Sequence, residues 1–304
     1  MTRARILVIG STNTDMVVEM TGLPRPGETV LGGAFRLTPG GKGANQAVAA
    51  ARAGGQVTFI TAVGTDRFGA ESVARFTEEG IDTRFIATHS AAPSGVALIL
   101  VDAQGENMIA VAPGANSLLD PGDLPEEAFA DVALLLMQLE IPLDTVCAAA
   151  RRAKAAGTLV LLNPAPMPLD GLPAALLAHV DYLIPNAGEL RTLAPDATSM
   201  KDAARLLLQR GPTALIVTRG KEGVEVFTRD AHFHVPAIPV HAIDTVGAGD
   251  CFSATLGVAL TEGQALPDAV RFAVAAAGLS TTRLGAQASM PTRAEIAQVL
   301  DAED

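Results

Sequence analysis

The chain has 304 residues, of which 49% are hydrophobic and 18% charged, and this composition excludes an intrinsically disordered protein. Its length is enough for one large or two ordinary domains with a substantial buried core. The formal net charge of -11 and the lack of a dense run of Lys and Arg argue against a nucleic-acid partner, because like charges repel.

The two cysteines and the first residues predict a protein of the cytoplasm. Cys147 and Cys251 lie far apart and without CxxC spacing, which indicates neither a disulfide framework nor a zinc site. The opening segment MTRARILVIG has too short an apolar run for a signal peptide and lacks a small-residue cleavage site. No run reaches the roughly 18 apolar residues of a membrane span, so we expect no membrane partner.

Short apolar strands are predicted to alternate with alanine-rich helices. We expect strands at 6–10, 57–64, 133–138, 158–163, 182–186 and 214–220. We expect helices in GANQAVAAARAG, RFGAESVARFTEEG, LDTVCAAARRAKAAG and MKDAARLLLQRG, several of which end at a Gly suited to a helix C-terminus. This order predicts an α/β fold, a Rossmann-like sandwich with a mostly parallel central sheet flanked by helices.

Two segments, 15–36 and 94–112, interrupt this alternation. They lack helical periodicity and are typical of strand pairs joined by Gly and Pro turns. We expect them to form a small inserted β-sheet, a lid over the cleft beyond the C-terminal strand ends, although two unrelated surface hairpins remain the alternative. No linker or repeat divides the chain, which predicts a single domain over 1–304.

The same two segments alternate poorly between polar and apolar residues, as VVEM and ALILV illustrate. Apolar side chains are therefore expected on both faces of the small sheet. A homodimer formed through the lid sheets would cover them.

The segment HAIDTVGAGDCFSATLGVAL, residues 241–260, carries the clearest candidate for chemistry. Its GAG turn precedes a helix predicted to begin near Asp250, so backbone N–H groups and the positive end of the helix dipole would hold a phosphate. Asp250 would then accept the proton of a substrate hydroxyl during phosphoryl transfer. A helix cap with a glycine turn is the alternative.

A second glycine-rich segment, TPGGKGANQAVAAARAG at 38–54, also precedes a helix. Lys42 and Asn45 offer donors to the oxygens of a polyol or a phosphate. The segment is not a Walker P-loop, because Gly43 follows the lysine where that motif needs Ser or Thr. A purely structural turn is the alternative.

Further polar residues follow other predicted strands. Asn13 and Asp15 in GSTNTD, Glu140 in MQLE, and Asn186 and Glu189 in PNAGE all lie at or just beyond the end of an apolar run. Each alone is also explained as a turn former. Because four strands deliver polar side chains to one edge of the sheet, together they predict a ligand site there.

The chain resembles the ribokinase-like carbohydrate kinases of the PfkB type over nearly its whole length. The motifs that carry the resemblance occur in the family's order, and they are GSTNTD, PRPGET, GGKGANQAVAAARAG, GENMIAVAPGAN, LLLMQLEIPL, LLNPAP, PNAGE, VHAIDTVGAGD and TTRLGAQASMP. The early Gly-Gly segment and the late DTVGAGD are the family's two signatures.

The resemblance implies a role for each matching residue. Asp250 would be the catalytic base, and the backbone amides of Gly247, Ala248 and Gly249 would form the anion hole. The sugar would be held by Asn13, Asp15, Gly41, Lys42, Gly43, Asn45, Glu140 and Asp250. The nucleotide would contact Asn186, Thr218, Arg219, Gly220, Lys221, Glu222, Gly223, Gly249 and Asp250.

The resemblance also implies two cations. Glu189 would lie near Mg²⁺ on the nucleotide phosphates. A monovalent cation such as K⁺ would be surrounded by Asp244, Val246, Ser280, Arg283, Gly285 and Ser289, whose oxygen atoms suit a hard cation. A local capping or pairing role for Asp244 is the alternative.

Several positions depart from the family's pattern. Arg219 replaces a common Leu and is expected to reach either the nucleotide or solvent, and Val274 stands where some relatives place His or Asn beside the adenine. Cys251, usually Thr or Ser, is expected to be a small buried filler. His232 and His234 are expected on a strand surface rather than at a metal.

The implied activity is phosphorylation of the terminal hydroxyl of D-ribose by ATP. Deoxyribose, fructose or a nucleoside such as adenosine are alternative acceptors. The two lid segments contain one aromatic residue, Phe35, which favours a bare sugar over a nucleoside, since bases stack on aromatic rings. A sugar-binding sensor without catalysis is the alternative from another class, and the intact Asp250 argues against it.

Overall fold

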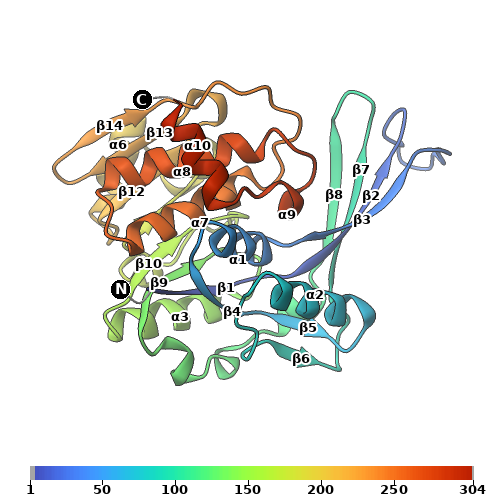
Figure 1. The fold of residues 1–304 in the computed structure, drawn as a ribbon, viewed down its shortest axis with the longest axis horizontal. Helices are drawn as coiled ribbons and strands as arrows, with labels where there is room; N and C mark the ends of the chain where they lie inside the picture. Colours follow the sequence, from blue (N-terminus) through green and yellow to red (C-terminus); the bar gives the residue numbers. More distant parts are fainter. Residues whose placement is uncertain (1–3, 303–304) are drawn as a thin grey trace.

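An eight-stranded sheet runs through the middle of the molecule with helices on both faces (Figure 1). The computed structural model describes residues 4–302, so the first three residues of the opening segment and the last two of the expected domain lie outside the described residues. The strands from one edge of the sheet to the other are β14 (His232–Val235), β13 (Val224–Thr228), β12 (Ala214–Thr218), β11 (Tyr182–Leu183), β10 (Leu159–Leu162), β9 (Val132–Met137), β1 (Arg5–Ile9) and β4 (Gln56–Ile60).

The central strands are apolar throughout because each face of the sheet is covered by its own core. In β1, Ile6 and Val8 pack into one core, whereas Leu7 and Ile9 pack into the other, and all four side chains are fully buried. In this sheet the neighbouring strands β4, β1, β9, β10, β11 and β12 are parallel. The strands β13 and β14 add antiparallel pairs at one edge. The predicted mostly parallel sheet is confirmed.

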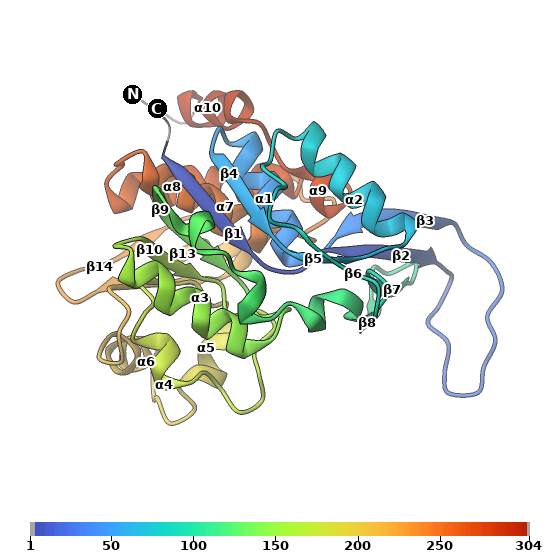
Figure 2. The ribbon, with the colours of Figure 1, turned by 90° about the horizontal axis from the view of Figure 1, so that it is seen from below.

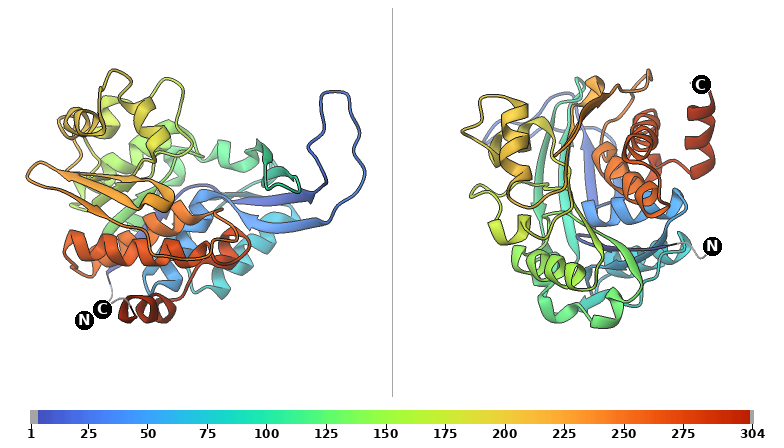
Figure 3. Two further views of the ribbon diagram at one scale, coloured as in Figure 1. Left: turned by 90° about the horizontal axis from the view of Figure 1, so that it is seen from above. Right: turned by 90° about the vertical axis from the view of Figure 1, so that its left-hand side faces the viewer.

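The helices form two layers, seen edge-on in the right-hand view of Figure 3. One layer contains α1 (Lys42–Arg52), α2 (Arg67–Glu78), α7 (Ala248–Thr261), α8 (Leu266–Ser280) and α10 (Arg293–Asp301). The other contains α3 (Leu143–Ala155), α4 (Ala174–Leu177), α5 (Ala187–Leu193) and α6 (Met200–Leu208). The four predicted helices are confirmed as α1, α2, α3 and α6. No helix within residues 4–302 is long and apolar enough to cross a membrane.

Short elements complete the chain. The strand expected at 57–64 is divided into β4 and β5 (Ala62–Gly64), and β5 pairs with β6 (Ala87–His89) in a sheet of its own. The remaining short helices are η1 (Gly114–Leu118), η2 (Pro121–Asp123), η3 (Glu126–Phe129), η4 (Gly220–Glu222) and α9 (Ala286–Ser289).

A separate four-stranded sheet extends away from the main body, as Figure 2 shows. Its strands, in spatial order, are β3 (Phe35–Gly40), β2 (Asn13–Glu19), β7 (Gly95–Val101) and β8 (Asn107–Ala112). All four come from the two segments that interrupt the α/β alternation, with β2 and β3 beginning and ending a few residues beyond the first. The predicted small sheet is therefore present.

The register of this sheet separates its side chains into two faces, because directly paired residues point to the same side. Asp15 pairs with Thr38 and Ala97. The face with Asp15 also carries Asn13, Ile99, Ile109 and Val111. The opposite face is apolar and carries Met16, Val18, Phe35, Leu37, Leu98, Leu100 and Met108. Both faces hold apolar side chains, which explains the poor alternation in the sequence.

Candidate active site

Asp250 lies in the first turn of α7, with its side chain almost completely buried at 5% exposure. The helix starts after Gly247, whose backbone is left-handed with φ 78°, a conformation that glycine adopts without strain. The helix therefore begins two residues earlier than Asp250, and the carboxylate projects from the end where unpaired amides and the positive dipole gather.

The amides that precede Asp250 differ in their partners. The Ala248 amide donates to the carbonyl of Thr245 at 3.2 Å and closes the turn before the helix. Within residues 4–302, the amides of Gly247, Gly249 and Asp250 have no protein acceptor. Of the three amides predicted for an anion hole, Ala248 is thus partly engaged, while that of Asp250 joins the available donors.

Two neighbouring amide side chains of α1 hold the Asp250 carboxylate. Asn45 donates from Nδ2 to Oδ2 at 2.9 Å, and Gln46 donates from Nε2 to Oδ1 at 3.0 Å. The start of α1 approaches the end of β1 closely, since a Cβ on Gly43 would lie 2.5 Å from the backbone carbon of Gly10. Glycine at position 43 therefore allows α1 to present both amides to α7.

Charges around Asp250 are of mixed sign. Burial raises the pKa of Asp250, whereas the charge of Lys42 and the hydrogen bonds from Asn45 and Gln46 lower it. The pKa of Lys42 is raised, mainly by the negative charge of Asp250 and further by Glu140 and Glu189. The Lys42 ammonium group therefore lies among three carboxylates.

The predicted sugar-binding residues gather on the side of the four-stranded sheet. Burial raises the pKa of Asp15 to about 6, and the negative charge of Glu140 contributes to the same shift. Glu140 Oε2 accepts hydrogen bonds from Ser11 Oγ at 2.5 Å and from the Lys42 amide at 3.0 Å. Asn13 Oδ1 accepts from Asn116 Nδ2 at 2.9 Å.

Glycines line this side of the candidate site. Gly41 precedes α1 with φ 89°, where a side chain would be strained, and an added Cβ would lie 2.7 Å from the Asn13 amide. A Cβ on Gly40 would lie 2.2 Å from the carboxylate oxygens of Asp15. The GG of the GGKGAN segment is thus required because the end of β3 and the start of α1 both lie close to β2.

A pocket of about 580 Å³ lies at the start of α7, between β12, α7 and α8. Its walls are mostly apolar and include Thr218, Gly220, Lys221, Gly223, Ala248, Gly249, Phe252 and Val274. The predicted nucleotide segment and the start of α7 therefore share one pocket. Val274 lines it as expected for a residue beside a base.

Arg219 and Glu222 are the two members of that segment that do not line the pocket. They pair with each other, and Arg219 Nη1 also contacts Glu225 Oε1 at 3.2 Å. The same Glu225 contacts His232 at 2.7 Å and His234 at 3.4 Å on β14. Arg219 is thus partly exposed to solvent, at 32% of its side chain, and also pairs with a cluster on the edge hairpin.

Asn186 and Glu189 form a capping box at the start of α5. The Asn186 side chain accepts from the amides of Gly188 and Glu189, and Glu189 Oε2 accepts from the Asn186 amide at 2.8 Å. Burial raises the pKa of Glu189, and the charge of Lys42 lowers it. Capping accounts for one carboxylate oxygen, and the second has no protein partner among residues 4–302.

Asp244 joins the two loops predicted to surround a monovalent cation. Its Oδ1 accepts from the Val246 amide at 3.0 Å, and its Oδ2 accepts from the Gly285 amide at 2.8 Å. The hydroxyl groups of Ser280 and Ser289 donate to carbonyls within their own helices. The local pairing of Asp244 is thus present, and it also brings the two predicted halves of the cation site together.

Cys251, next to Asp250, is fully buried, and burial raises the pKa of its thiol to about 12. It is a buried filler, as expected.

Sequence reasoning missed the buried amide groups behind Asp250. Gln46, Gln138 and Asn163 connect the carboxylate to the ends of β9 and β10. The signal was present, because Gln138 and Asn163 each follow a long apolar strand, as the predicted site residues do. Ser11 and Asn116, which contact Glu140 and Asn13, were missed as well.

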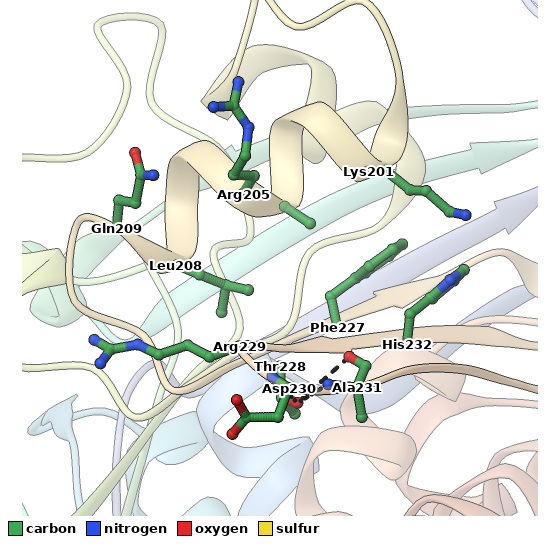
Figure 4. Close-up of a pocket in the computed structure, with 11 residues that line it drawn as sticks. Lys201, Arg205, Leu208, Gln209, Phe227, Thr228, Arg229, Asp230, Ala231 and His232 are labelled. Atoms are coloured by element: carbon green, nitrogen blue, oxygen red, sulfur yellow. Dashed lines mark hydrogen bonds between the residues drawn. The ribbon is translucent and has the colours of Figure 1, made fainter.

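A second hollow, of about 680 Å³, lies between α6 and the β13–β14 hairpin (Figure 4). Phe227 stacks on His232 there, with 4.3 Å between ring centroids. Lys201, Arg205 and Arg229 surround the hollow but point in different directions in Figure 4. None of the predicted site residues lines it.

Comparison with known proteins identifies the relatives of the chain. The model of a family described as pfkB family carbohydrate kinase matches residues 3–293. The chain is 40% identical over 305 residues to the ribokinase of Haemophilus influenzae, with 98% of this chain and 99% of that protein covered. It is 38% identical over 293 residues to the deoxyribokinase of Salmonella typhi, with 94% and 95% covered.

A solved structure has the same fold. The ribokinase of Arabidopsis thaliana, solved in complex with ribose and ATP, matches with a TM-score of 0.91 and 30% identity, covering 98% of this chain and 99% of that one. The predicted fold class is confirmed.

Proposed function

The chain belongs to the pfkB family of carbohydrate kinases, and we propose that this sugar kinase transfers the terminal phosphoryl group of ATP to the primary hydroxyl of D-ribose. The products are ribose 5-phosphate and ADP. The position of Asp250 carries the proposal. Its carboxylate contacts Asn45 and lies near Lys42, and the two residues before it, Ala248 and Gly249, line the pocket at the start of α7.

Asp250 acts as the general base in this proposal. Its carboxylate accepts the proton of the ribose hydroxyl while that oxygen forms a bond to the γ-phosphorus. The bond between the γ-phosphorus and the bridging oxygen breaks, and ADP leaves with the electron pair. Lys42, whose pKa the charge of Asp250 raises, offers positive charge to the transferring group.

In this proposal the sugar is recognised by the polar groups near the four-stranded sheet. Asn13 and Asp15 share a face of the four-stranded sheet and suit the 2- and 3-hydroxyls of ribose. Asn45 and Glu140, with the backbone at Gly41 and Gly43, complete the proposed set. That face of the sheet also carries the apolar Ile109 and Val111, which would exclude water when the sheet closes as a lid.

The residues of the nucleotide side fit a magnesium-bound triphosphate. Mg²⁺ is usually bound by one or two carboxylates together with phosphate oxygens and water, and Glu189 keeps one carboxylate oxygen for such contacts. When bound, the ion neutralises phosphate charge and orients the γ-phosphate. The amides of Gly249 and Asp250 donate to oxygens that gain charge during transfer, and Thr218, Gly220, Lys221 and Gly223 border the nucleotide.

A monovalent cation such as K⁺ is proposed between the loops that Asp244 joins. The candidate ligands are oxygen atoms of Asp244, Val246, Ser280, Arg283, Gly285 and Ser289. Both loops flank the start of α7, so an ion there would support the geometry of the anion hole. Comparing turnover in K⁺ with turnover in Na⁺ or a tetraalkylammonium salt tests this part alone.

The apolar outer face of the four-stranded sheet supports a homodimer. Phe35, Leu98 and Met108 on this face are between 52% and 61% exposed, and a second copy placed against them would remove these surfaces from water.

ATP as co-substrate and the two free cysteines suit the cytoplasm.

The similarity to a deoxyribokinase makes deoxyribose the second candidate acceptor. A coupled assay of ADP release with ribose, deoxyribose, fructose and adenosine separates the two. We expect the highest kcat/KM with ribose. A higher kcat/KM with deoxyribose would overturn the ribose assignment, and ribose binding without ADP release would support a sensor.

A further inference from the structure

Gln46 is a completely buried side chain with a polar partner on every side. Its Nε2 group donates to Asp250 Oδ1 at 3.0 Å and to Asn163 Oδ1 at 3.3 Å. Its Oε1 accepts from Gln138 Nε2 at 2.5 Å. Both N–H bonds and the carbonyl group are therefore used, and the side chain has one orientation that satisfies them all.

The two partners behind Gln46 anchor it to the main sheet. Gln138 is the residue after β9 and is also fully buried. Asn163 follows β10 and donates from Nδ2 to the carbonyl of Ile184 at 3.0 Å. The amide that touches the base is thus tied to two adjacent strand ends, which are rigid parts of the fold.

The second oxygen of the base is held by a different kind of group. Asn45, the donor to Oδ2, is one of the proposed sugar ligands, and its Oδ1 accepts from Gln287 at 3.3 Å. Oδ2 thus faces a residue proposed to bind the sugar, whereas Oδ1 faces the buried amide of Gln46. The two carboxylate oxygens are therefore not equivalent.

We propose that Gln46 is a positioning residue that holds Asp250 through Oδ1, so that Oδ2 is the oxygen that takes the proton from the sugar. This inference rests on the proposed function. A donor to a carboxylate stabilises its charged form, so Gln46 also lowers the pKa of Asp250 against the effect of burial.

The charged groups that face Asp250 come from three other elements. They are Lys42 on α1, Glu140 after β9 and Glu189 on α5. Lys42 favours the ionised base, and the two glutamates oppose it. Loss of the Gln46 donor leaves these charges in place, so the pKa of Asp250 rises. As the pH is lowered, Asp250 is then protonated, and the base form lost, at a higher pH than in the parent.

The test is the pH dependence of kcat/KM from about pH 5 to 9, measured for Gln46→Met with the sugar that the parent enzyme uses best. Met keeps the length of the side chain and removes its hydrogen bonds. We expect kcat to fall about 10²-fold, the KM for ATP to stay within about twofold, and the acidic limb to move to higher pH.

Three further variants make the test decisive. Gln138→Met removes one of the two anchors of Gln46 and should shift the acidic limb in the same direction by less. Gln46→Glu keeps the shape but places a second carboxyl group against Asp250, so the pair shares a proton and the limb should move by about one pH unit or more. Gln298→Met, on the exposed face of α10, is the matched control and should leave the profile unchanged.

A lower melting temperature with an unchanged pH profile in Gln46→Met and Gln138→Met would show a structural role only and overturn the proposal. Where Gln46→Met does not fold, the profile of Gln46→Glu decides, and a limb at the parent position overturns it. Failure of the proposed function is seen separately, because the parent itself would then release no ADP with any sugar.

Discussion

The end of the main sheet and the four-stranded sheet both contribute to the candidate site, but they hold their side chains differently. Around Asp250, which is 5% exposed, Gln46 and Gln138 are fully buried, and each has a hydrogen-bond partner. On the small sheet, Ile109 and Val111 are 57% and 51% exposed. The groups around Asp250 are thus held by the protein itself, whereas the four-stranded sheet leaves apolar side chains exposed to solvent.

Replacement of the base should have the largest effect. Asp250→Asn preserves shape and removes the proton acceptor, so we expect kcat for ribose to fall by about 10³-fold or more. The melting temperature should change little, because removal of a buried charge offsets the loss of one of the two hydrogen bonds that Asp250 accepts. Calorimetry should show ribose binding within a few-fold of the parent. Turnover close to the parental value would mean that the fixed region does not contain the base.

The junction between α1 and β1 should be the next most sensitive point. Gly43→Ala places a methyl group 2.5 Å from the backbone of Gly10, so α1 must move away and carry Asn45 and Gln46 with it. We expect a loss of about 1–3 kcal/mol in the free energy of unfolding, together with lower kcat. Gly22→Ala, where an added Cβ meets nothing within 4 Å, is the control. Equal behaviour of the two variants would contradict the packing described here.

Asp15 connects the two regions and should show a pH effect of its own. Its pKa is raised to about 6, so the protein is more stable below the unfolded value near 3.8 and loses that contribution as pH rises through about 6. Asp15→Asn should therefore stabilise the free protein by roughly 1–3 kcal/mol at pH 8, measured by urea unfolding.

The same variant should bind ribose less tightly, because an acceptor for its hydroxyls is lost. In the parent, the KM for ribose should rise as pH falls below about 6. A variant that is neither more stable nor weaker in ribose binding would show that Asp15 belongs to the exposed region alone.

The smallest effect on chemistry is expected on the outer face of the small sheet. Leu98→Glu places a charge in the proposed dimer interface, so light scattering should report a lower mass than for the parent at the same concentration. The kcat should change less than in any variant above. Arg229→Glu, at the hollow beside α6, is the control. A parent that is already monomeric would remove the dimer from the account.

Much of the fold was predictable because buried strands and alanine-rich helices leave clear patterns. The glycine segments also marked the starts of α1 and α7 correctly. The contact of Gln46 with Asp250 was not predictable, because adjacent helical residues point about 100° apart and only one of Asn45 and Gln46 is expected to face a given group.

The pairing of Arg219 with Glu225 was not predictable for a different reason. Its partner Glu225 lies on β13, and the hairpin of β13 and β14 was not predicted as part of the main sheet. The cluster around Glu225 depends on pairing between strands, which local sequence patterns do not determine.

The most direct test of the account is a crystal structure of Asp250→Asn with ribose and ATP bound. The primary hydroxyl of ribose should lie within about 2.6–3.2 Å of the side chain at position 250, on the Oδ2 side, and in line with the γ-phosphorus. The other terminal atom of the side chain at position 250 should still face Gln46. A ribose hydroxyl several ångströms from that side chain, or an ATP molecule outside the pocket at the start of α7, would contradict the account.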